Sequence, residues 1–208
     1  MRTWPALSLL IAVAASASAC RQSGTDGHAG VPADARLVEA NEPGPNASTR
    51  RSFSLIDQHG QAVTDADFRG QWLVVFFGFM HCADFCPATL FKLRQTLTQL
   101  GDDAGKVRVL FITVDPERDT PAFMEKYLKS FGSQFVAGTG SMEQVSAAAR
   151  TFRTYFQKQP AAADGSYAVD HSTHIYVVNP HGELDRQMSS GATPEQIAAA
   201  LSTAMGTT

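Results

Sequence analysis

Two long apolar runs stand out in the hydrophobic pattern of the chain, at Trp72–Phe79 and Val107–Val114. Runs of this kind, rich in Val and Phe, are typical of strands that are buried on both faces of a sheet. Between them, leucines recur at helical spacing from Pro87 to Leu100, which predicts an amphipathic helix. Before them, an alternating segment at 53–56, a turn and a partner segment at 61–64 predict a β-hairpin.

Capping residues mark the starts of three further helices. In two of them a threonine precedes a proline, and in the third a serine is followed three residues later by a glutamine, as in a capping box. These helices are expected over 120–131, over 141–156 and from 193 onward. Short strands are expected at 135–136, 173–178 and 183–188, and residues 160–168 should form a loop or hairpin tip.

This alternation of strands and helices indicates the fold class. Strands separated by helices form sheets with parallel strands and crossover helices. The last strand pair and the final helix complete the pattern. We therefore expect an α/β protein with a thioredoxin-like fold over residues 51–208, with a central mixed sheet, crossover helices and an N-terminal β-hairpin extension.

The first nineteen residues have the layout of a secretory signal. Arg2 precedes a short apolar run, and small residues lead up to Cys20. The end of this segment resembles a bacterial lipobox, so we expect residues 1–19 to be removed and Cys20 to carry lipid. The alternative is ordinary cleavage near Ala19, which leaves the cysteine unmodified. The pattern predicts an exported protein that is lipid-anchored at the periplasmic face of a bacterial membrane.

Composition supports one domain behind a tether. Residues 20–50 are rich in Gly, Ala, Pro, Asn and Ser, which predicts a flexible, lipid-anchored tether. The 208 residues are 44% hydrophobic, enough for a core, and carry a formal net charge of −3. A nucleic-acid binder would show a basic excess, so we expect no nucleic-acid partner. If Cys20 carries lipid, Cys82 and Cys86 remain as a pair.

Cys82 and Cys86 are the strongest candidates for chemistry. They lie where the first buried strand gives way to the helix, and their spacing predicts that both thiols share one face of the first helical turn. A helix N-terminus stabilises thiolates, so we expect lowered thiol pKa values. Their three-residue spacer leaves room for a metal ion, and soft thiolates favour Cu(I) and Zn(II). A structural disulfide is the alternative, although so local a loop would stabilise the fold little.

Three motifs together resemble a known family. They are FFGFMHCADFCPATL, TVDPERDTP and VDHSTHIYVVNPHGEL, in this order along the predicted domain. They resemble the SCO/SenC family of copper-binding thioredoxin-like proteins, which assists assembly of the dinuclear copper site of cytochrome c oxidase. The resemblance implies that copper, as Cu(I), Cu(II) or both, is bound by Cys82, Cys86 and His171. Met80 and Ala83 depart from the family pattern, but neither change removes a ligand.

The expected fold also suggests a place for His171. In a thioredoxin-like fold, the loop before the third central strand faces the cysteine pair, and an imidazole there would reach a metal held by both sulfurs. A solvated loop histidine is the alternative. Weaker candidates adjoin these ligands or follow the second buried strand: His81, His174, Met80, Asp84, Asp115 and Arg118. The last two either support the site or dock a partner, or they serve only the turn in which they lie.

The leading hypothesis is therefore a metallochaperone, rather than an enzyme, that delivers copper to the copper-bearing subunit of cytochrome c oxidase. The first alternative is a thiol-disulfide reductase that keeps the copper-binding cysteines of a partner reduced. It would need Cys82 and Cys86 but not His171. The second alternative is a sensor whose docking depends on its copper or disulfide state. We expect a monomer that is attached to the membrane through its N-terminal lipid.

Overall fold

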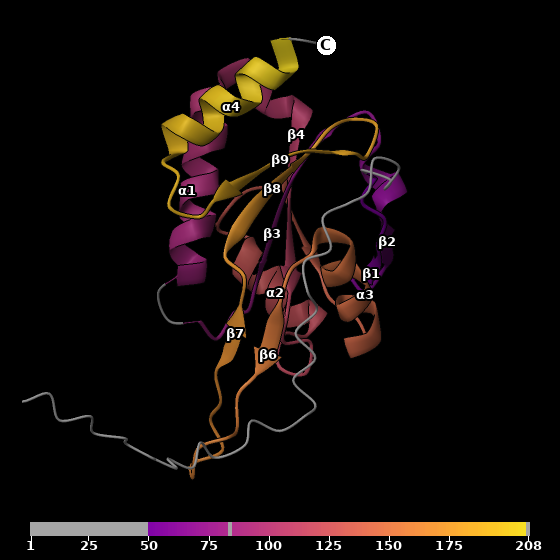
Figure 1. Cartoon of the computed structure of the whole chain (residues 1–208), viewed down its shortest axis with the longest axis vertical. Coiled ribbons are helices and arrows are strands. Elements are labelled where there is room, and N and C mark those ends of the chain that lie inside the picture. The colour runs from indigo at the N-terminus through magenta and orange to yellow at the C-terminus, as the bar shows by residue number, and fades with distance from the viewer. Residues whose placement is uncertain (1–49, 83–84, 207–208) are drawn as a thin grey trace, which may run out of the picture. The chain divides into compact units, whose positions relative to one another are not determined.

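The computed structural model describes residues 50–82 and 85–206 (Figure 1). The predicted signal segment, the lipid acceptor Cys20 and almost all of the predicted tether lie outside these residues. Within them, every helix falls short of the length and hydropathy that a membrane span requires.

A five-stranded mixed sheet forms the centre of the described part. In spatial order its strands are β5 (Phe135–Gly138), β4 (Val107–Thr113), β3 (Trp72–Gly78), β8 (His174–Val178) and β9 (Leu184–Ser189). The first three run parallel to one another. β8 pairs antiparallel with β3, and β9 pairs antiparallel with β8. The predicted central mixed sheet is confirmed.

Alternate residues of β3 face opposite sides of the sheet, and both sides are covered. Val74 and Phe76 belong to a buried cluster with the leucines of α1 (Phe85–Leu100), whereas Val75 and Phe77 belong to a second buried cluster. A strand that is covered on both faces needs apolar residues at every position. This requirement explains the continuous apolar run in the sequence.

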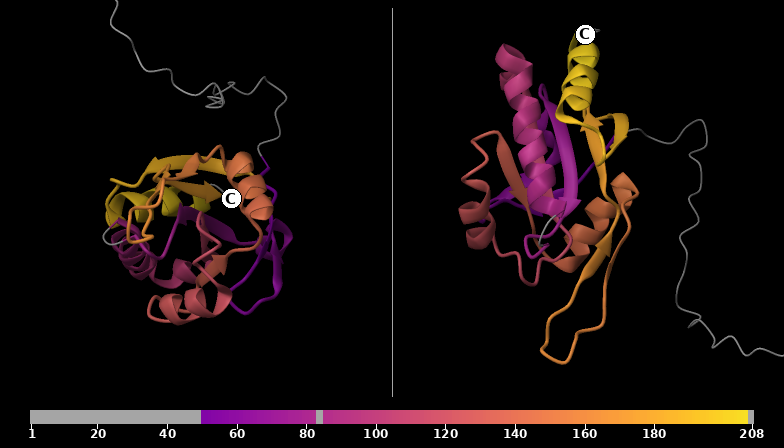
Figure 2. Two further views of the ribbon diagram at one scale, coloured as in Figure 1. Left: turned by 90° about the horizontal axis from the view of Figure 1, so that it is seen from below. Right: turned by 90° about the vertical axis from the view of Figure 1, so that its left-hand side faces the viewer.

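Helices lie on both faces of the sheet (Figures 1 and 2). On one face, apolar residues of α1, α2 (Pro121–Leu128) and α4 (Pro194–Gly206) share one buried cluster, and α1 packs against α4. On the other face, α3 (Met142–Phe152) packs near the hairpin of β1 (Ser54–Ile56) and β2 (Ala62–Thr64). The predicted N-terminal hairpin and the crossover helices are confirmed.

A second hairpin, which the sequence pattern did not predict, follows α3. It consists of β6 (Phe156–Lys158) and β7 (Val169–His171), paired antiparallel, and it extends beyond the sheet as an arm (Figures 1 and 2). The helix predicted to run to Phe156 ends at Phe152, because Arg153 adopts a left-handed conformation with a φ of 55°. The chain then turns into β6, and the predicted hairpin tip is the end of this arm.

Other boundaries differ by a few residues. α2 ends at Leu128 rather than at about Phe131, and α1 begins at Phe85, so that Cys86 is its second residue. Two short 3-10 helices connect neighbouring elements, and they span Asp65–Phe68 and Gly101–Lys106.

Three chain segments meet at one end of the sheet. β3 and β4 are parallel with Gly78 opposite Thr113, so the segments that follow them leave from the same edge. β8 is antiparallel to β3 with Ile175 opposite Phe76, so the chain enters β8 at that edge. We call the segment that joins β3 to α1 and carries Cys82 the cysteine loop. It begins at the same edge of the sheet where the segment after β4 begins and where the chain arrives from β7.

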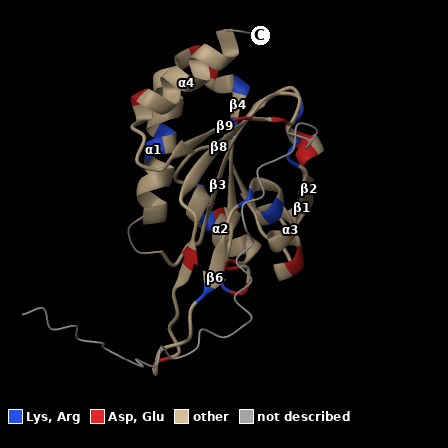
Figure 3. Cartoon of the chain, in the orientation of Figure 1, with Lys and Arg blue, Asp and Glu red and all other residues tan. Residues whose placement is uncertain are grey.

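Charged residues are interspersed over the described part of the chain (Figure 3). Basic and acidic residues both occur on helices and loops, which is consistent with the small formal net charge of −3. The electrostatics at the end of the sheet therefore depend on particular pairs of residues, such as Arg118 with Asp115.

Candidate metal centre

The two thiols lie side by side at the start of α1. Cys86 is 1% exposed, whereas Cys82 precedes the helix and is half-buried. Within the described chain both are free, and their side chains are in hydrogen-bonding contact. The prediction that both occupy the first helical turn is wrong, because Cys82 lies in the preceding turn. There its N–H donates to the carbonyl oxygen of Phe79 at 3.3 Å.

Burial raises the pKa of the Cys86 thiol to about 12. A hydrogen bond with the backbone of Phe79 opposes this shift, while Cys82 and the carboxylate of Asp119 add to it. The expected lowering of the thiol pKa is therefore wrong for Cys86, because loss of solvent around the thiolate outweighs the helix dipole. A metal ion that binds this sulfur must displace its proton.

His171 is the last residue of β7 rather than a loop residue, and it is half-buried. Its Nδ1–H donates to the carbonyl oxygen of Ser172 at 2.9 Å, because a carbonyl oxygen can only accept. This hydrogen bond leaves the lone pair on Nε2, where a metal can bind. Burial lowers the pKa of the imidazole, although the Ser172 carbonyl acts in the opposite direction. The ring is therefore held neutral.

The ring of His171 contacts both ends of the cysteine loop. Phe79 lies before Cys82 in the chain, and Phe85 lies directly before Cys86. Each makes an edge contact with the imidazole, at centroid distances of 5.9 Å and 6.4 Å. Among the described residues, no three His, Cys, Asp or Glu side chains are close enough together to hold a metal ion. The structure thus brings the thiols into contact and His171 beside their loop, and the three-ligand set stays a prediction.

The chemistry of these donors fits copper. Two thiolates and a neutral imidazole form a soft and borderline donor set, which Cu(I) accepts. The aromatic rings of Phe79 and Phe85 contact the same imidazole and add apolar surface beside the donors. The residues present are therefore compatible with the copper that the motifs imply.

The weaker candidates take different positions. His174 is exposed at the start of β8, with its ring centroid 6.3 Å from that of Tyr176. Met80 is buried in the cluster that contains α1, as a packing residue would be. Asp84 lies outside the described residues.

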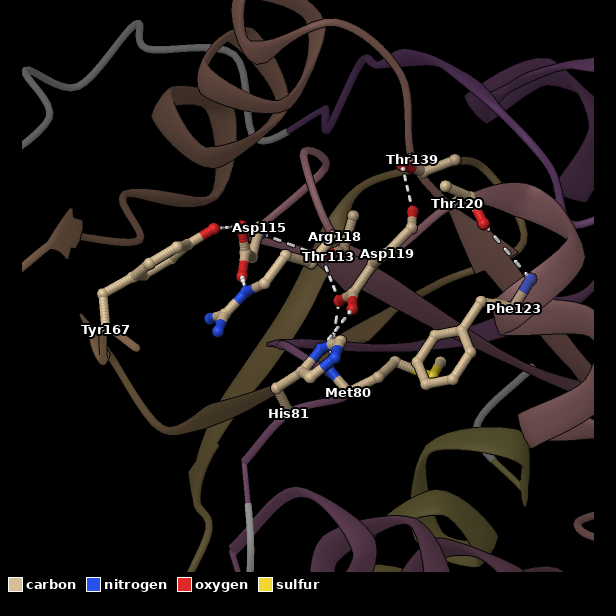
Figure 4. Close-up of polar contacts among 10 residues, drawn as sticks. All are labelled: Met80, His81, Thr113, Asp115, Arg118, Asp119, Thr120, Phe123, Thr139 and Tyr167. Atoms are coloured by element: carbon tan, nitrogen blue, oxygen red, sulfur yellow. Dashed lines mark hydrogen bonds and ion pairs between the residues drawn. The ribbon is translucent and has the colours of Figure 1, made fainter. Parts of the chain in front are cut away.

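Asp119 is a buried carboxylate that the sequence analysis did not single out (Figure 4). Its Oδ2 accepts hydrogen bonds from the Met80 N–H at 3.0 Å and the Thr113 hydroxyl at 2.6 Å. Its Oδ1 has no hydrogen-bond partner in the described part and lies 3.5 Å from Nδ1 of His81. Burial raises the pKa of this carboxyl group, and the two hydrogen bonds oppose that shift. Asp119 therefore ties the segment after β4 to the backbone just before Cys82.

Arg118 joins the same segment to the arm formed by β6 and β7 (Figure 4). Its Nε donates to Asp115 at 2.5 Å, and its guanidinium lies over the rings of Tyr167 at 3.7 Å and Phe79 at 5.8 Å. The Tyr167 hydroxyl also donates to Asp115, at 2.9 Å. Asp115 and Arg118 thus support the arm that ends in His171. Tyr167 was missed because it lies in a predicted loop with no apolar period.

A family model described as SCO1/SenC matches residues 41–206 of this sequence. The chain belongs to the SCO1/SenC family. It is 45% identical over 147 residues to the mitochondrial SCO2 homolog of Bos taurus, a match that covers 70% of this chain and 55% of that protein. It is 37% identical over 155 residues to the human mitochondrial SCO1 homolog, covering 74% and 52%. The chain thus spans about half the length of these curated relatives.

Solved structures of family members have the same fold. ScoI of Bradyrhizobium japonicum with copper bound is 40% identical, with a TM-score of 0.68 over 74% of this chain and 98% of that chain. Yeast Sco1 with copper bound is 30% identical, with a TM-score of 0.71 over 78% and 91%. The inferred SCO/SenC resemblance and the thioredoxin-like fold are confirmed. Copper, which the motifs implied, is bound in both of these SCO1/SenC structures.

The predicted location is wrong. The two curated relatives described above are mitochondrial proteins, which overturns the placement at the periplasmic face of a bacterial membrane, held there by lipid on Cys20. That placement depended on the first twenty residues alone. Their lack of acidic residues and their many alanines and serines are features that targeting segments for different compartments share. Such a pattern does not distinguish one compartment from another.

Proposed function

We propose that this chain binds copper through Cys82, Cys86 and His171 and, as a metallochaperone, helps to assemble the dinuclear copper site of cytochrome c oxidase. The proposal is carried by the contact of the His171 ring with Phe79 and Phe85 at the two ends of the cysteine loop. An imidazole with an Nε2 lone pair thus contacts the two aromatic residues that precede the free thiols in the chain.

Ligand exchange accounts for reversible binding at such a site. The Cys86 thiol is neutral before binding, because burial raises its pKa to about 12, so copper binding releases a proton. Cys82 is the more exposed sulfur and is the one that the thiolates of an acceptor meet first. Acceptor thiolates then replace the three donors one at a time, and copper is never released into water as a free ion.

Titration of the reduced protein with Cu(I) tests this proposal. We expect one copper per monomer, and Cys82→Ser or Cys86→Ser should abolish tight binding. His174→Ala is the matched control, because this exposed histidine lies near the same end of the sheet and should leave binding unchanged. Oxidation to the Cys82–Cys86 disulfide should also abolish binding, since a disulfide offers no thiolate. Full binding by the oxidised protein would contradict the proposal.

A thiol-disulfide reductase remains the second candidate, because the half-buried Cys82 is in contact with Cys86. The Cys82 thiolate would attack a disulfide of the partner and form a mixed disulfide. Cys86 would then resolve it, leaving a Cys82–Cys86 disulfide and two reduced thiols on the partner. This exchange does not require His171. If His171→Ala supports normal oxidase assembly at limiting copper, the reductase replaces the chaperone as the proposed function.

A further inference from the structure

We propose that His81 is an additional copper ligand, which forms with Cys82 an outward-facing entrance to the predicted site. The inference rests on the proposed function and adds the route by which copper enters and leaves. Copper held by Cys82, Cys86 and His171 is surrounded by buried or half-buried groups. A ligand that is both exposed and adjacent to one of these donors would allow exchange without a free ion.

His81 has this position. Its side chain is 43% exposed, whereas Cys82 is half-buried and Cys86 is fully buried. Its ring stacks on that of Phe123 in α2, with centroids 5.4 Å apart and an angle of 26° between the planes. Exposure therefore decreases from His81 to Cys82 and from Cys82 to Cys86.

The His81 ring lies next to a buried carboxylate (Figure 4). The side chain of Asp119 is completely buried, and its Oδ1 lies 3.5 Å from Nδ1 of His81. Nε2 lies on the other side of the ring and is directed away from the carboxylate. Histidines that bind metals commonly donate their second ring N–H to a carboxylate, which fixes the tautomer and the orientation of the ring.

The hydrogen bonding of Asp119 is a second observation that indicates a role for His81 in metal binding. Oδ2 of Asp119 is already bonded to the Met80 N–H and the Thr113 hydroxyl, whereas Oδ1 has no hydrogen-bond partner within the described chain. A buried oxygen without a partner destabilises the fold. If the Nδ1–H of His81 moved from 3.5 Å to hydrogen-bonding distance of Oδ1, it would satisfy this oxygen and leave the lone pair on Nε2. Copper bound at Nε2 selects that tautomer, so ligand binding and the hydrogen bond support each other.

Transfer between the two ligand sets needs no oxidation or reduction. In the entrance state, Cu(I) is bound by the Cys82 thiolate and Nε2 of His81, which are a soft and a borderline donor. Cys86 then loses its thiol proton to solvent, and its thiolate replaces His81. His171 completes the inner site. Release follows the reverse order, with Cys82 bound to copper throughout.

The first test measures rates and affinity separately. Reduced wild type, His81→Ala and the control His174→Ala are mixed in a stopped-flow instrument with the Cu(I) complex of bicinchoninate. Uptake by the protein, and return of copper to excess bicinchoninate, are followed by absorbance. We expect His81→Ala to slow both uptake and return by about tenfold or more, an effect of the size seen when groups around a metal are removed. The dissociation constant should stay the same, because the inner site is intact, and His174→Ala should match wild type.

The second test isolates the entrance. The double variant Cys86→Ser with His171→Ala lacks two of the three inner ligands and should still bind one Cu(I) weakly. X-ray absorption should show one sulfur and one nitrogen donor. Adding His81→Ala to this variant should remove the nitrogen and the retained copper. Circular dichroism of each variant confirms that the fold is kept.

Each outcome decides between the two proposals. If copper in the reduced wild type is not bound by both Cys82 and Cys86, the proposed function itself is overturned. If wild type binds copper and His81→Ala takes it up and returns it at wild-type rates, only the entrance is overturned. A dissociation constant that rises with the loss of His81 would place this histidine in the final site, which also contradicts an entrance role.

Discussion

A β-carbon on Gly78 would lie 2.8 Å from the Sγ atom of Cys86. Real β-carbons do not approach a sulfur so closely, so the end of β3 must be a glycine for the thiol to occupy its buried position. The same β-carbon would lie 3.0 Å from the ring of Phe111, which belongs to the same buried cluster as Cys86. The backbone of β3 and the thiol of α1 are therefore fitted to each other.

Gly78→Ala should both destabilise the fold and weaken copper binding. Overpacking of this kind costs about 1–3 kcal/mol of unfolding free energy, and displacement of Cys86 should lower copper affinity by about tenfold. Gly138→Ala is the matched control, because its β-carbon would lie 2.8 Å from Leu55, away from the cysteines. Urea unfolding and Cu(I) titration check both variants. Equal copper affinity in the two would show that the position of Cys86 is not tied to Gly78.

Much of the fold follows from local sequence, and the reason is visible at β3 and α3. β3 is apolar throughout because helices and the hairpin cover both of its faces. The start of α3 is marked by Ser141 and Gln144, which form the predicted capping box with reciprocal hydrogen bonds. Its end is not marked, because Arg153 adopts the left-handed conformation where glycine or asparagine is usual.

The parts that could not be predicted depend on contacts between distant segments. β6 and β7 have only three residues each and pair across the arm, so neither shows a period in the sequence. The motifs identified Cys82, Cys86 and His171 as candidates, but not the burial that raises the pKa of the Cys86 thiol. Asp119 resembles a turn residue in the sequence, and its bonds to Met80 and Thr113 appear only once β3 and β4 are paired.

Alkaline pH should destabilise the reduced protein through Cys86. Its pKa is raised from 9.0 to about 12 on folding, so between these values the folded state retains a proton that the unfolded state has lost. The free energy of unfolding therefore falls as the pH rises through this range, by about 1.4 kcal/mol per pH unit at most. Urea unfolding between pH 7 and pH 10 checks this prediction.

Cys86→Ala is the reference for that series. The variant loses packing at every pH, but it lacks the titrating thiol, so its stability should fall less steeply above pH 9. Tyr176, whose pKa is raised by burial and not by Cys86, is present in both proteins and cancels in the comparison. Parallel stability curves for wild type and Cys86→Ala would contradict a raised pKa of this thiol.

Tyr167→Phe should loosen the arm that ends in His171. Removing the hydroxyl leaves the buried Asp115 without one of its hydrogen bonds, which should cost about 1–2 kcal/mol. Hydrogen exchange of the β6 and β7 amides should become faster. Tyr155→Phe, directly before β6, is the control, because within the described residues its hydroxyl bonds to the exposed Gln157 alone and its loss should cost less than about 0.5 kcal/mol. Equal exchange rates in the two variants would refute the bracing role of Tyr167.

X-ray absorption spectroscopy of the reduced, Cu(I)-loaded protein tests the central claim most directly. The measurement compares the His81→Ala protein with the same protein carrying His171→Ala as well, so that His81 cannot substitute for the missing imidazole. We predict two sulfur donors and one nitrogen donor in the first, and loss of the nitrogen with about a tenfold or greater fall in copper affinity in the second. Identical spectra and affinities for the two proteins would show that His171 is not a copper ligand and would contradict the proposed site.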